Sequence, residues 1–297
     1  MKISRLLNDA ALRLLQAQIE DPAFEAGLIL SWAIGKPRSF IYAHPDMELS
    51  PDEVRGFMEL VERRSRGGPF QYITGECEFM SLRFKVNPKV LIPRSETELL
   101  AEAALFSLGC DQPFMDPRLF RVSKQGARRV LDIGTGSGCL AVSVAWYAKN
   151  ILVDALDISE EALEIARQNA GINNVSGCIR FIRADFLSDQ GFTSHKYDLI
   201  ISNPPYIPRD DKTGLMPSVE KYEPEGALFA DDGGLCFYKR LAGLSREILN
   251  EGGVILVECG FNQSASVQDI FQSHGMETMS IKDLSGTERV IAARMRV

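Results

Sequence analysis

The stretch that most constrains the fold is 197–206, which reads Tyr-Asp-Leu-Ile-Ile-Ser-Asn-Pro-Pro-Tyr. Its apolar run at 199–201 is typical of a strand that is buried on both faces of a parallel sheet. The two consecutive prolines carry no N–H donor, so a central strand cannot continue through them. A buried strand that ends there places Asn203 and Tyr206 at the carboxyl edge of the sheet, where open α/β sheets bind ligands.

This strand end, Asn203-Pro204-Pro205-Tyr206, can hold a planar –NH2 group. The Asn203 side-chain oxygen and the Pro204 carbonyl are two acceptors at a fixed separation, because Pro205 fixes φ near −65°. Tyr206 can stack on the π-face of the amide or base that carries the –NH2 group. The alternative is a proline-stiffened strand exit that buries a tyrosine.

Predicted strands and helices alternate from residue 129 onward. We expect strands at 129–133, 151–156, 179–183, 197–202 and 254–258, and two closing strands near 277–282 and 289–294. Repeated β-α-β units predict a mostly parallel sheet with helices on both faces.

A glycine-rich loop follows the first of these strands and is a candidate cofactor site. It consists of Gly134, Thr135, Gly136, Ser137 and Gly138. Its glycines let the backbone turn sharply and approach a ligand closely. The dinucleotide pattern G-x-G-x-x-G fails because Cys139 occupies its third position. The observed G-x-G-x-G, with Asp132 upstream, resembles the S-adenosylmethionine loop of class I methyltransferases.

Three more residues at successive strand ends support this interpretation. Asp157 ends the next strand, where a carboxylate can accept both hydroxyls of a ribose. Asp185 and Phe186 end the strand after it, and the alternatives for them are a helix cap and core packing, respectively.

The first part of the chain lacks strand patterns. Apolar stripes predict amphipathic helices from residues 3–19, 22–34 and from 51 to about 66, the last with a Ser50/Glu53 capping box. A small helical domain of this kind suits a docking or lid role, or plain scaffolding.

The connecting segments carry weaker signals. Alternation within 72–86 predicts a β-hairpin. Ser95 and Glu98 predict a second capping box, and Arg94 before it is either a ligand contact or a solvated arginine. Residues 110–127 show no periodicity, so we expect an exposed loop.

Composition excludes several classes of protein. The net charge of −7, from 33 Lys+Arg and 40 Asp+Glu, argues against a protein that grips a phosphate backbone unaided. The six cysteines form no C-x-x-C pair and the three histidines have no metal-ligand spacing, so we expect no metal. No signal peptide or membrane-spanning run is present, so we expect a cytoplasmic protein with reduced thiols.

Taken together, the motifs resemble the protein-(glutamine-N5) methyltransferases that modify peptide-chain release factors. The resemblance covers nearly the whole chain. It is carried by the segments 69–75, 78–79, 90–98, 134–138, 157–159, 203–207, 223–228, 286 and 289–290. The Leu-Ile-Pro-Arg segment at 91–94, joined to a helical N-terminal domain, is more specific than Asn-Pro-Pro-Tyr, which several amino-group methyltransferases share.

The resemblance implies a class I methyltransferase fold, Rossmann-like and mostly parallel, at 89–297. It also implies a helical substrate-docking domain at 1–71 and a hairpin linker at 72–88. The activity would be N5-methylation of glutamine in the Gly-Gly-Gln motif of class-1 release factors. S-adenosylmethionine would be the cofactor, and we expect a monomer. Two departures stand out: Ser95 replaces the usual proline, and the 110–127 loop is longer than usual.

Residue roles are carried over by position. The loop Gly134–Gly138 with Asp157, Asp185, Phe186 and Asn203 would contact the cofactor. Catalysis would fall to Asn203, Pro204 and Tyr206, which with Pro205 and Arg94 would also bind the substrate.

Two other functions remain open. The same motif serves methyltransferases that act on the exocyclic amine of adenine, although neither the first 86 residues nor the rest of the chain is basic. A non-catalytic module that keeps the cofactor fold is the other alternative, and an intact Asn-Pro-Pro-Tyr argues against it.

Overall fold

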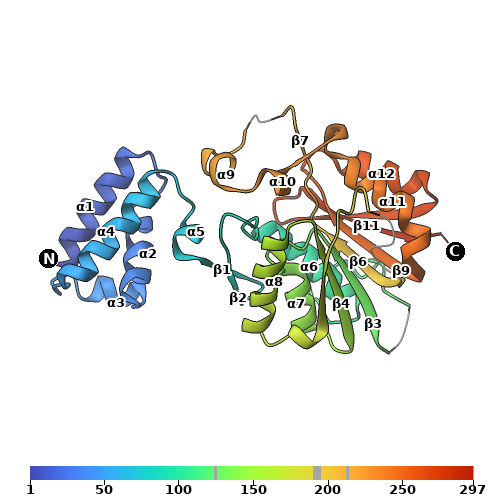
Figure 1. Cartoon of the computed structure of the whole chain (residues 1–297), viewed down its shortest axis with the longest axis horizontal. Helices are drawn as coiled ribbons and strands as arrows, with labels where there is room; N and C mark the ends of the chain where they lie inside the picture. The colour runs from blue at the N-terminus through green and yellow to red at the C-terminus, as the bar shows by residue number, and fades with distance from the viewer. Residues whose placement is uncertain (124–125, 190–194, 212–213, 297) are drawn as a thin grey trace. The chain divides into compact units, whose positions relative to one another are not determined.

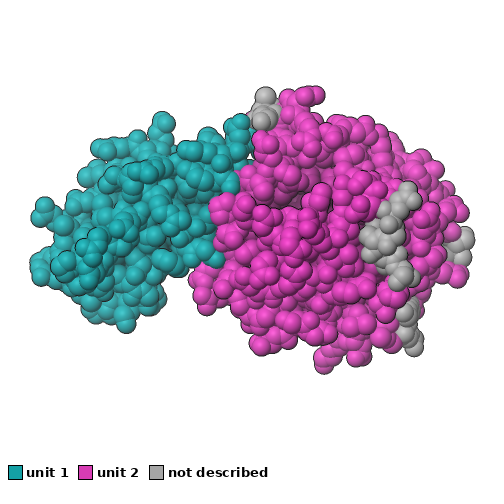
Figure 2. Space-filling view, viewed as in Figure 1, with its two compact units in different colours: residues 1–75, 215–222 teal, residues 76–214, 223–297 magenta. Residues whose placement is uncertain are grey.

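The computed structural model describes residues 1–123, 126–189, 195–211 and 214–296, and the chain separates into two compact units (Figures 1 and 2). The first unit holds residues 1–75 and 215–222, and the second holds 76–214 and 223–297. Each unit buries apolar side chains of its own. A segment late in the sequence therefore belongs to the N-terminal unit.

The first unit is helical, as predicted. Its helices are α1 (Ile3–Gln16), α2 (Pro22–Ile34), α3 (Arg38–Ala43), α4 (Pro51–Ser65), α5 (Phe70–Thr74) and α9 (Pro217–Tyr222). The Ser50/Glu53 capping box of α4 is confirmed by hydrogen bonds in both directions. Helix α1 ends three residues earlier than predicted, because Gln18 and Asp21 adopt left-handed φ values of 57° and 47°. Tyr222 fastens α9 to this unit by donating its hydroxyl to the Arg66 carbonyl, 2.9 Å away.

The second unit opens with the predicted hairpin, β1 (Glu76–Phe79) paired antiparallel with β2 (Leu82–Lys85). The hairpin is shorter than predicted, because residues 72–74 belong to helix α5, which ends where Gly75 has a φ of 78°. Asn169 fixes the hairpin to a helix of the same unit. Its Oδ1 accepts from the Lys85 N–H at 2.7 Å, and its Nδ2 donates to the Lys85 carbonyl at 3.0 Å.

A seven-stranded sheet forms the centre of the second unit, in the order β10-β11-β9-β6-β3-β4-β5. Its strands are β3 (Arg128–Ile133), β4 (Ile151–Asp157), β5 (Ile179–Arg183), β6 (Tyr197–Ser202), β9 (Leu249–Glu258), β10 (Met276–Lys282) and β11 (Glu288–Met295). All neighbours are parallel except β11, which runs antiparallel to β9 and β10. Short strands β7 (Ile207–Pro208) and β8 (Phe229–Ala230) pair separately. The predicted α/β fold is confirmed.

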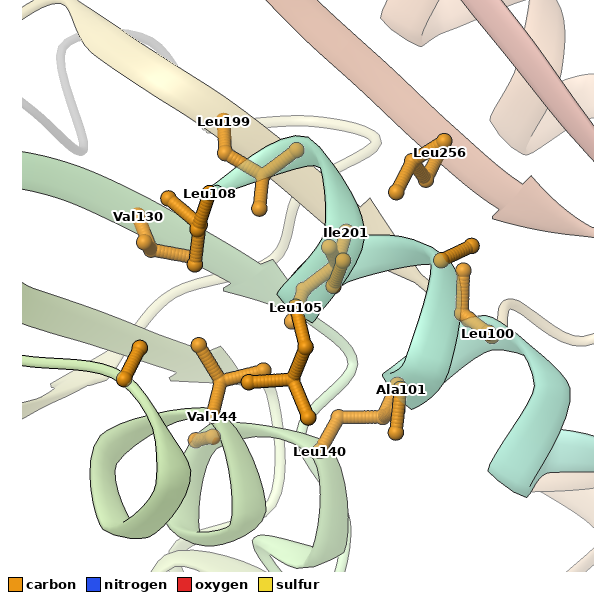
Figure 3. Close-up of a cluster of buried hydrophobic side chains, with 14 of the residues drawn as sticks. Leu100, Ala101, Leu105, Leu108, Val130, Leu140, Val144, Leu199, Ile201 and Leu256 are labelled. Atoms are coloured by element: carbon orange, nitrogen blue, oxygen red, sulfur yellow. The ribbon is translucent and has the colours of Figure 1, made fainter. Parts of the chain in front are cut away.

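Helices cover both faces of this sheet. They are α6 (Ser95–Ser107), α7 (Cys139–Tyr147), α8 (Glu160–Ile172), α11 (Cys236–Ile248) and α12 (Ser264–Ser273). The short helix α10 (Glu225–Leu228) instead precedes β8 and contacts it. In Figure 3, Leu105 of α6 lies beside Ile201 of β6, and Val144 of α7 belongs to the same cluster on this face. Ile200 packs into a second cluster, which contains residues of α11 and α12. Strand β6 is thus buried on both faces, as its apolar run predicts.

Two predictions of local structure were wrong: the capping box of helix α6 and the exposure of residues 110–127. Helix α6 begins at Ser95, so its cap position is Arg94, and no side chain caps it. The expected capping box is absent because the Glu98 carboxylate instead accepts from the Met80 N–H of the hairpin turn, at 2.5 Å.

The segment 110–127 is irregular in its described residues but not wholly exposed. Met115, Leu119 and Phe120 are buried in the cluster that α6 and α7 share. Their burial could not be predicted from the sequence, because apolar residues that are widely spaced in an irregular segment show no periodicity.

Candidate active site

A cavity of about 580 Å³ lies in the second unit, where β3, β4, β5 and β6 end. Seven of the predicted site residues line it: Gly134, Gly136, Asp157, Asp185, Phe186, Asn203 and Pro205. The other predicted residues, Thr135, Ser137, Gly138, Pro204, Tyr206 and Arg94, are not among its lining. The carboxyl edge of the sheet thus forms one pocket from segments distant in sequence, as open α/β sheets do.

The glycines of the loop after β3 have different surroundings. Gly134 and Gly136 have φ values of 72° and 54°, and at both a Cβ would meet nothing closer than 4.0 Å among the described residues. Their backbone therefore borders open space. A Cβ on Gly138 would lie 3.0 Å from the Ala166 Cβ, so this glycine lets α7 and α8 pack closely.

The side chains of this loop point away from the cavity. Thr135 and Ser137 are buried, and the Thr135 hydroxyl donates to Asp132 Oδ2 at 2.6 Å. The same oxygen accepts from the Ala141 N–H at 3.2 Å. Asp132 thus holds the loop in place through these two hydrogen bonds.

The Asp132 carboxyl is itself held in an unfavourable environment. Burial raises its pKa from 3.8 to about 7, although its bonds to Thr135 and Ala141 oppose the rise. Its Oδ1 is buried without a hydrogen-bond partner in the described part of the chain.

Asp157, at the end of β4, is oriented by backbone groups. Its Oδ2 accepts from the Gly136 N–H at 2.8 Å and its Oδ1 from the Ser159 N–H at 2.9 Å. Burial raises the pKa of Asp157, and these backbone bonds lower it. Each carboxylate oxygen has a second lone pair, so Asp157 can still accept hydrogen bonds from a ligand in the cavity.

Asp185 and Phe186 follow β5. The Asp185 carboxylate accepts from the Leu187 N–H at 2.9 Å and from the Ser188 hydroxyl at 2.7 Å, so it caps a turn as well as lining the cavity. Phe186 is buried, and its ring lies 6.3 Å from the nearly parallel ring of Phe237. Both roles considered for each residue are thus compatible with its position.

Asn203, directly after β6, is held by a buried side chain. Its Nδ2 donates to Thr97 Oγ1 at 3.0 Å. Because this amide can present only one end to Thr97, its Oδ1 is left for a donor elsewhere. Asn203 lines the cavity, so an acceptor is offered there.

The rest of the tetrapeptide is fixed by packing and by Gln263. Pro204 is buried beside Phe186 and Tyr238. The Tyr206 carbonyl accepts from Gln263 Nε2 at 2.8 Å, and burial raises the pKa of the Tyr206 phenol to about 12. The phenol therefore stays neutral at physiological pH.

Arg94 forms an ion pair rather than lining the cavity. Its Nη2 lies 2.6 Å from Glu223 Oε1, and the Glu223 side chain is 1% exposed. Glu223 immediately precedes Pro224, Gly226 and Ala227, which do line the cavity. Arg94 is therefore paired with the residue that leads into this part of the cavity lining.

The described lining of the cavity is acidic. Its carboxylates are Asp157, Glu161, Asp185 and Asp231, and its bases are Lys89 and Arg209. Lys89 pairs with Glu161 at 3.4 Å, and Arg209 pairs with Asp231 at 2.5 Å. The unbalanced charge belongs to Asp157 and Asp185, which suits a cationic ligand better than a pyrophosphate.

Several functional candidates were missed by sequence reasoning. They are Thr97, Glu223, Phe237, Glu258, Gln263 and the lining residues Pro224, Gly226 and Ala227. Thr97 and residues 223–227 lie in segments that carry the family resemblance, which assigns them no role. Phe237, Glu258 and Gln263 carry no local pattern. Among the described residues, no group of three or more His, Cys, Asp or Glu could hold a metal ion, and no helix is both long and apolar enough to cross a membrane.

The sheet order, the glycine loop after the first parallel strand and the acidic cavity at its carboxyl edge define the class I methyltransferase fold. The structure of the hMettl16 catalytic domain in complex with MAT2A 3'UTR hairpin 6 shares this fold, with a TM-score of 0.53 and 15% identity over 85% of this chain and 84% of that one. The family described as methyltransferase small domain matches residues 118–216.

The chain belongs to the release factor glutamine methyltransferase family. The PrmC N-terminal domain family matches residues 5–75. The release factor glutamine methyltransferase of Moorella thermoacetica is 34% identical over 298 residues, covering 100% of this chain and 99% of that protein. That of Geobacter sulfurreducens is 35% identical, covering 95% and 93%.

Other relatives are longer. A bifunctional methyltransferase of Rickettsia bellii is 35% identical over 302 residues, which span 97% of this chain but 54% of that protein. The chain therefore covers about half the length of such relatives.

Proposed function

We propose that this protein transfers a methyl group from S-adenosylmethionine to the side-chain nitrogen of the glutamine in the Gly-Gly-Gln motif of class-1 release factors. The observation that carries the proposal is the Asn203 amide, fixed through Nδ2 by Thr97, so that its Oδ1 offers an acceptor at the cavity. The names of the full-length relatives support the substrate class.

The residues around the cavity fit S-adenosylmethionine. A volume of about 580 Å³ lies within the range of roughly 300–1,000 Å³ that holds ligands of this size. Gly134 and Gly136 leave their backbone open to a ligand, Asp157 can accept ribose hydroxyls, and Phe186 offers an apolar wall for an adenine ring. When bound, this cofactor supplies an electrophilic methyl group on a positively charged sulfur.

The chain's own contribution to the reaction is to orient a weak nucleophile. An amide nitrogen reacts poorly because its lone pair is delocalised into the carbonyl. In the proposed arrangement, Asn203 Oδ1 and the Pro204 carbonyl accept the two N–H groups of the glutamine amide. They hold its nitrogen in the reacting geometry and stabilise the positive charge that develops on it.

Tyr206 and the apolar part of the lining complete the site. The Tyr206 ring can stack on the glutamine amide, and its backbone is held by Gln263. The apolar lining, including Phe186 and Phe237, limits water and thereby strengthens the hydrogen bonds to the amide. The proton lost from nitrogen can leave to solvent after transfer.

The function is tested with mass spectrometry. The protein is incubated with methyl-labelled S-adenosylmethionine and a release factor, and the modified residue is located. We expect a single added methyl group on the glutamine of Gly-Gly-Gln and none when that glutamine is replaced by glutamate. Labelled adenine in a DNA control with unmodified release factor would contradict the proposal and favour an adenine methyltransferase.

The helical region, residues 1–71, is proposed to dock the release factor. Its unit and the sheet unit bury separate apolar clusters, so the sheet unit does not depend on the helical core for its own. Deleting residues 1–75 is expected to leave S-adenosylhomocysteine affinity unchanged while raising KM for the release factor about ten-fold. A short Gly-Gly-Gln peptide, which needs no docking surface, is the control substrate. If the deletion leaves kcat/KM unchanged for the release factor as well as for the peptide, the segment does not dock the release factor.

A further inference from the structure

Glu258 is a buried acid that the proposed mechanism does not use. It ends β9, and Ser202 and Val257 are register partners across β6 and β9, so Asn203 and Glu258 follow side by side at the carboxyl edge. Glu258 is 3% exposed, and its Oε2 has no hydrogen-bond partner among the described residues. A buried, half-satisfied carboxyl is unfavourable, which makes its presence beside Asn203 informative.

Thr97 of α6 connects these two residues. It is 2% exposed and accepts from Asn203 Nδ2 at 3.0 Å. It also lies against Glu258, because hydrogen bonding by its side chain lowers the pKa of that carboxyl. A threonine hydroxyl has one proton to donate. When Glu258 is ionised it can only accept, so the Thr97 proton is held by Glu258. Thr97 can then only accept from Asn203.

This assignment of hydrogen-bond donors and acceptors fixes the orientation of the Asn203 amide. An amide flipped by 180° would place Oδ1 against the Thr97 oxygen with no proton between them. If Glu258 is protonated, it can donate to Thr97, whose own proton is then free to bind a flipped Asn203. The flipped amide would present –NH2 to the cavity, and –NH2 cannot accept an N–H from a substrate.

We propose that Glu258 is a positioning residue which, through Thr97, keeps the Asn203 oxygen facing the cavity and so selects substrates that offer a primary amide or amine. The inference rests on the proposed function for its substrate but concerns residues to which that function assigns no part.

The charge of Glu258 depends on its surroundings. Burial raises its pKa from 4.5 to about 7, opposed by the Thr97 hydrogen bond and the positive charge of Arg289. The other titratable or charged groups that interact electrostatically with it are Glu96, Arg94, Tyr206, Tyr238 and Cys259. Glu288 interacts in the same way with Cys259. The ionised, orienting form is therefore present above this pKa and lost as pH falls through about 7.

The first test is kinetic, with the full-length protein and a Gly-Gly-Gln peptide. Glu258→Leu, which leaves no acceptor for the Thr97 proton, and Thr97→Val are expected to lower kcat about ten-fold or more, while S-adenosylhomocysteine affinity and KM change less than about two-fold. Thr97→Ser restores the hydroxyl and should recover most of the activity. Glu277→Leu removes an acid that pairs with Arg294 in the same sheet and serves as the matched control. The double variant should be no worse than the poorer single variant, because both break one chain of bonds.

The second test needs no variant at position 258. In wild-type protein labelled with 15N-asparagine, the side-chain NH2 resonance of Asn203, assigned by its loss in Asn203→Ala, should shift with pH with a midpoint near 7. The wild-type kcat should fall along the same curve. This measurement decides between the two orientations of Asn203 even if a variant at position 258 does not fold.

The outcomes are separable. A wild-type protein that does not methylate the peptide contradicts the proposed function, whereas the resonance of Asn203 still reports on the orientation. Turnover at the wild-type rate in Glu258→Leu, with the same fall at low pH, or an Asn203 resonance that does not titrate, overturns the role of Glu258 and leaves the proposed function in place.

Discussion

The two halves of the cavity edge hold their polar groups by similar means but differ in what is fixed. In the half proposed to bind the cofactor, formed by Asp132, the loop 134–138 and Asp157, a buried acid and backbone N–H groups fix the backbone. In the half proposed to bind the substrate, formed by Asn203–Tyr206, Thr97 and Glu258, Thr97 accepts from one side-chain amide, and the proposed role of the buried Glu258 is to orient that amide through Thr97. A backbone conformation that the sheet holds tolerates changes of side chain. The orientation of the Asn203 amide depends on both Thr97 and Glu258.

This comparison predicts that changes in the substrate half reduce turnover and changes in the cofactor half reduce binding. The largest expected effect is that of Asn203→Ala. Removing one preorganised hydrogen-bonding group from the transition state should lower kcat by roughly 100-fold or more. The fold should persist, because Asn203 is only partly buried and follows the end of β6. Thermal unfolding and S-adenosylhomocysteine titration are the controls, and a kcat within two-fold of wild type would remove Asn203 from the reaction.

Asp157→Ala is the corresponding change in the cofactor half. It leaves the Gly136 and Ser159 N–H groups without their acceptor and removes the acceptor for ribose hydroxyls. We expect binding of S-adenosylhomocysteine to weaken by about 1–3 kcal/mol, measured by isothermal titration. Saturating cofactor should restore most of the wild-type kcat. Unchanged affinity would place the cofactor elsewhere.

The two buried acids make a smaller prediction that concerns stability. The pKa values of Asp132 and Glu258 are raised to about 7, so the folded state binds protons that the unfolded state has released. The contribution of these two carboxyl groups to the stability of the folded state is therefore present at low pH and is lost as pH rises from about 4 to about 7. At pH near 8, Asp132→Asn and Glu258→Gln should each raise the free energy of unfolding by about 1–3 kcal/mol, less whatever hydrogen bonding they lose.

Chemical denaturation at several pH values measures this effect. The gap between variant and wild type should widen between about pH 4 and pH 7 and then stay constant. A gap that is independent of pH would show that neither carboxyl has a raised pKa in the folded state.

The parts of the fold that sequence predicts are those with local signals. Buried runs in β6 and the repeated β-α-β pattern predict the parallel sheet, and Ser50 and Glu53 predict the cap of helix α4, which the structure confirms. The Ser95 cap fails because the partner that Glu98 binds, the Met80 N–H, comes from the hairpin. A residue pattern along one helix holds no information about a donor 18 residues away.

The candidate site divides in the same way. Gly134, Asp157, Asp185 and Asn203 are found from sequence because each follows a recognisable strand. Thr97 and Glu258 are not, because Thr97 reaches Asn203 across 106 residues and Glu258 looks like any acid at the end of a buried run. The residues that hold the site are harder to predict than the residues that form it, since only the fold brings them together.

The most direct test of the account is Asn203→Asp. The new carboxylate keeps an acceptor at the cavity, but it cannot donate to Thr97, whose single proton must then serve two acids. Its negative charge should hold a cationic ligand as tightly as wild type or more tightly, while the substrate amide loses its ordered partner.

Titration with S-adenosylmethionine and single-turnover methylation of a Gly-Gly-Gln substrate would therefore be measured on this variant side by side. The account predicts equal or tighter binding with a reduced methylation rate. Methylation at the wild-type rate, in this variant and in Asn203→Ala, would contradict the claim that the Asn203 amide holds the glutamine.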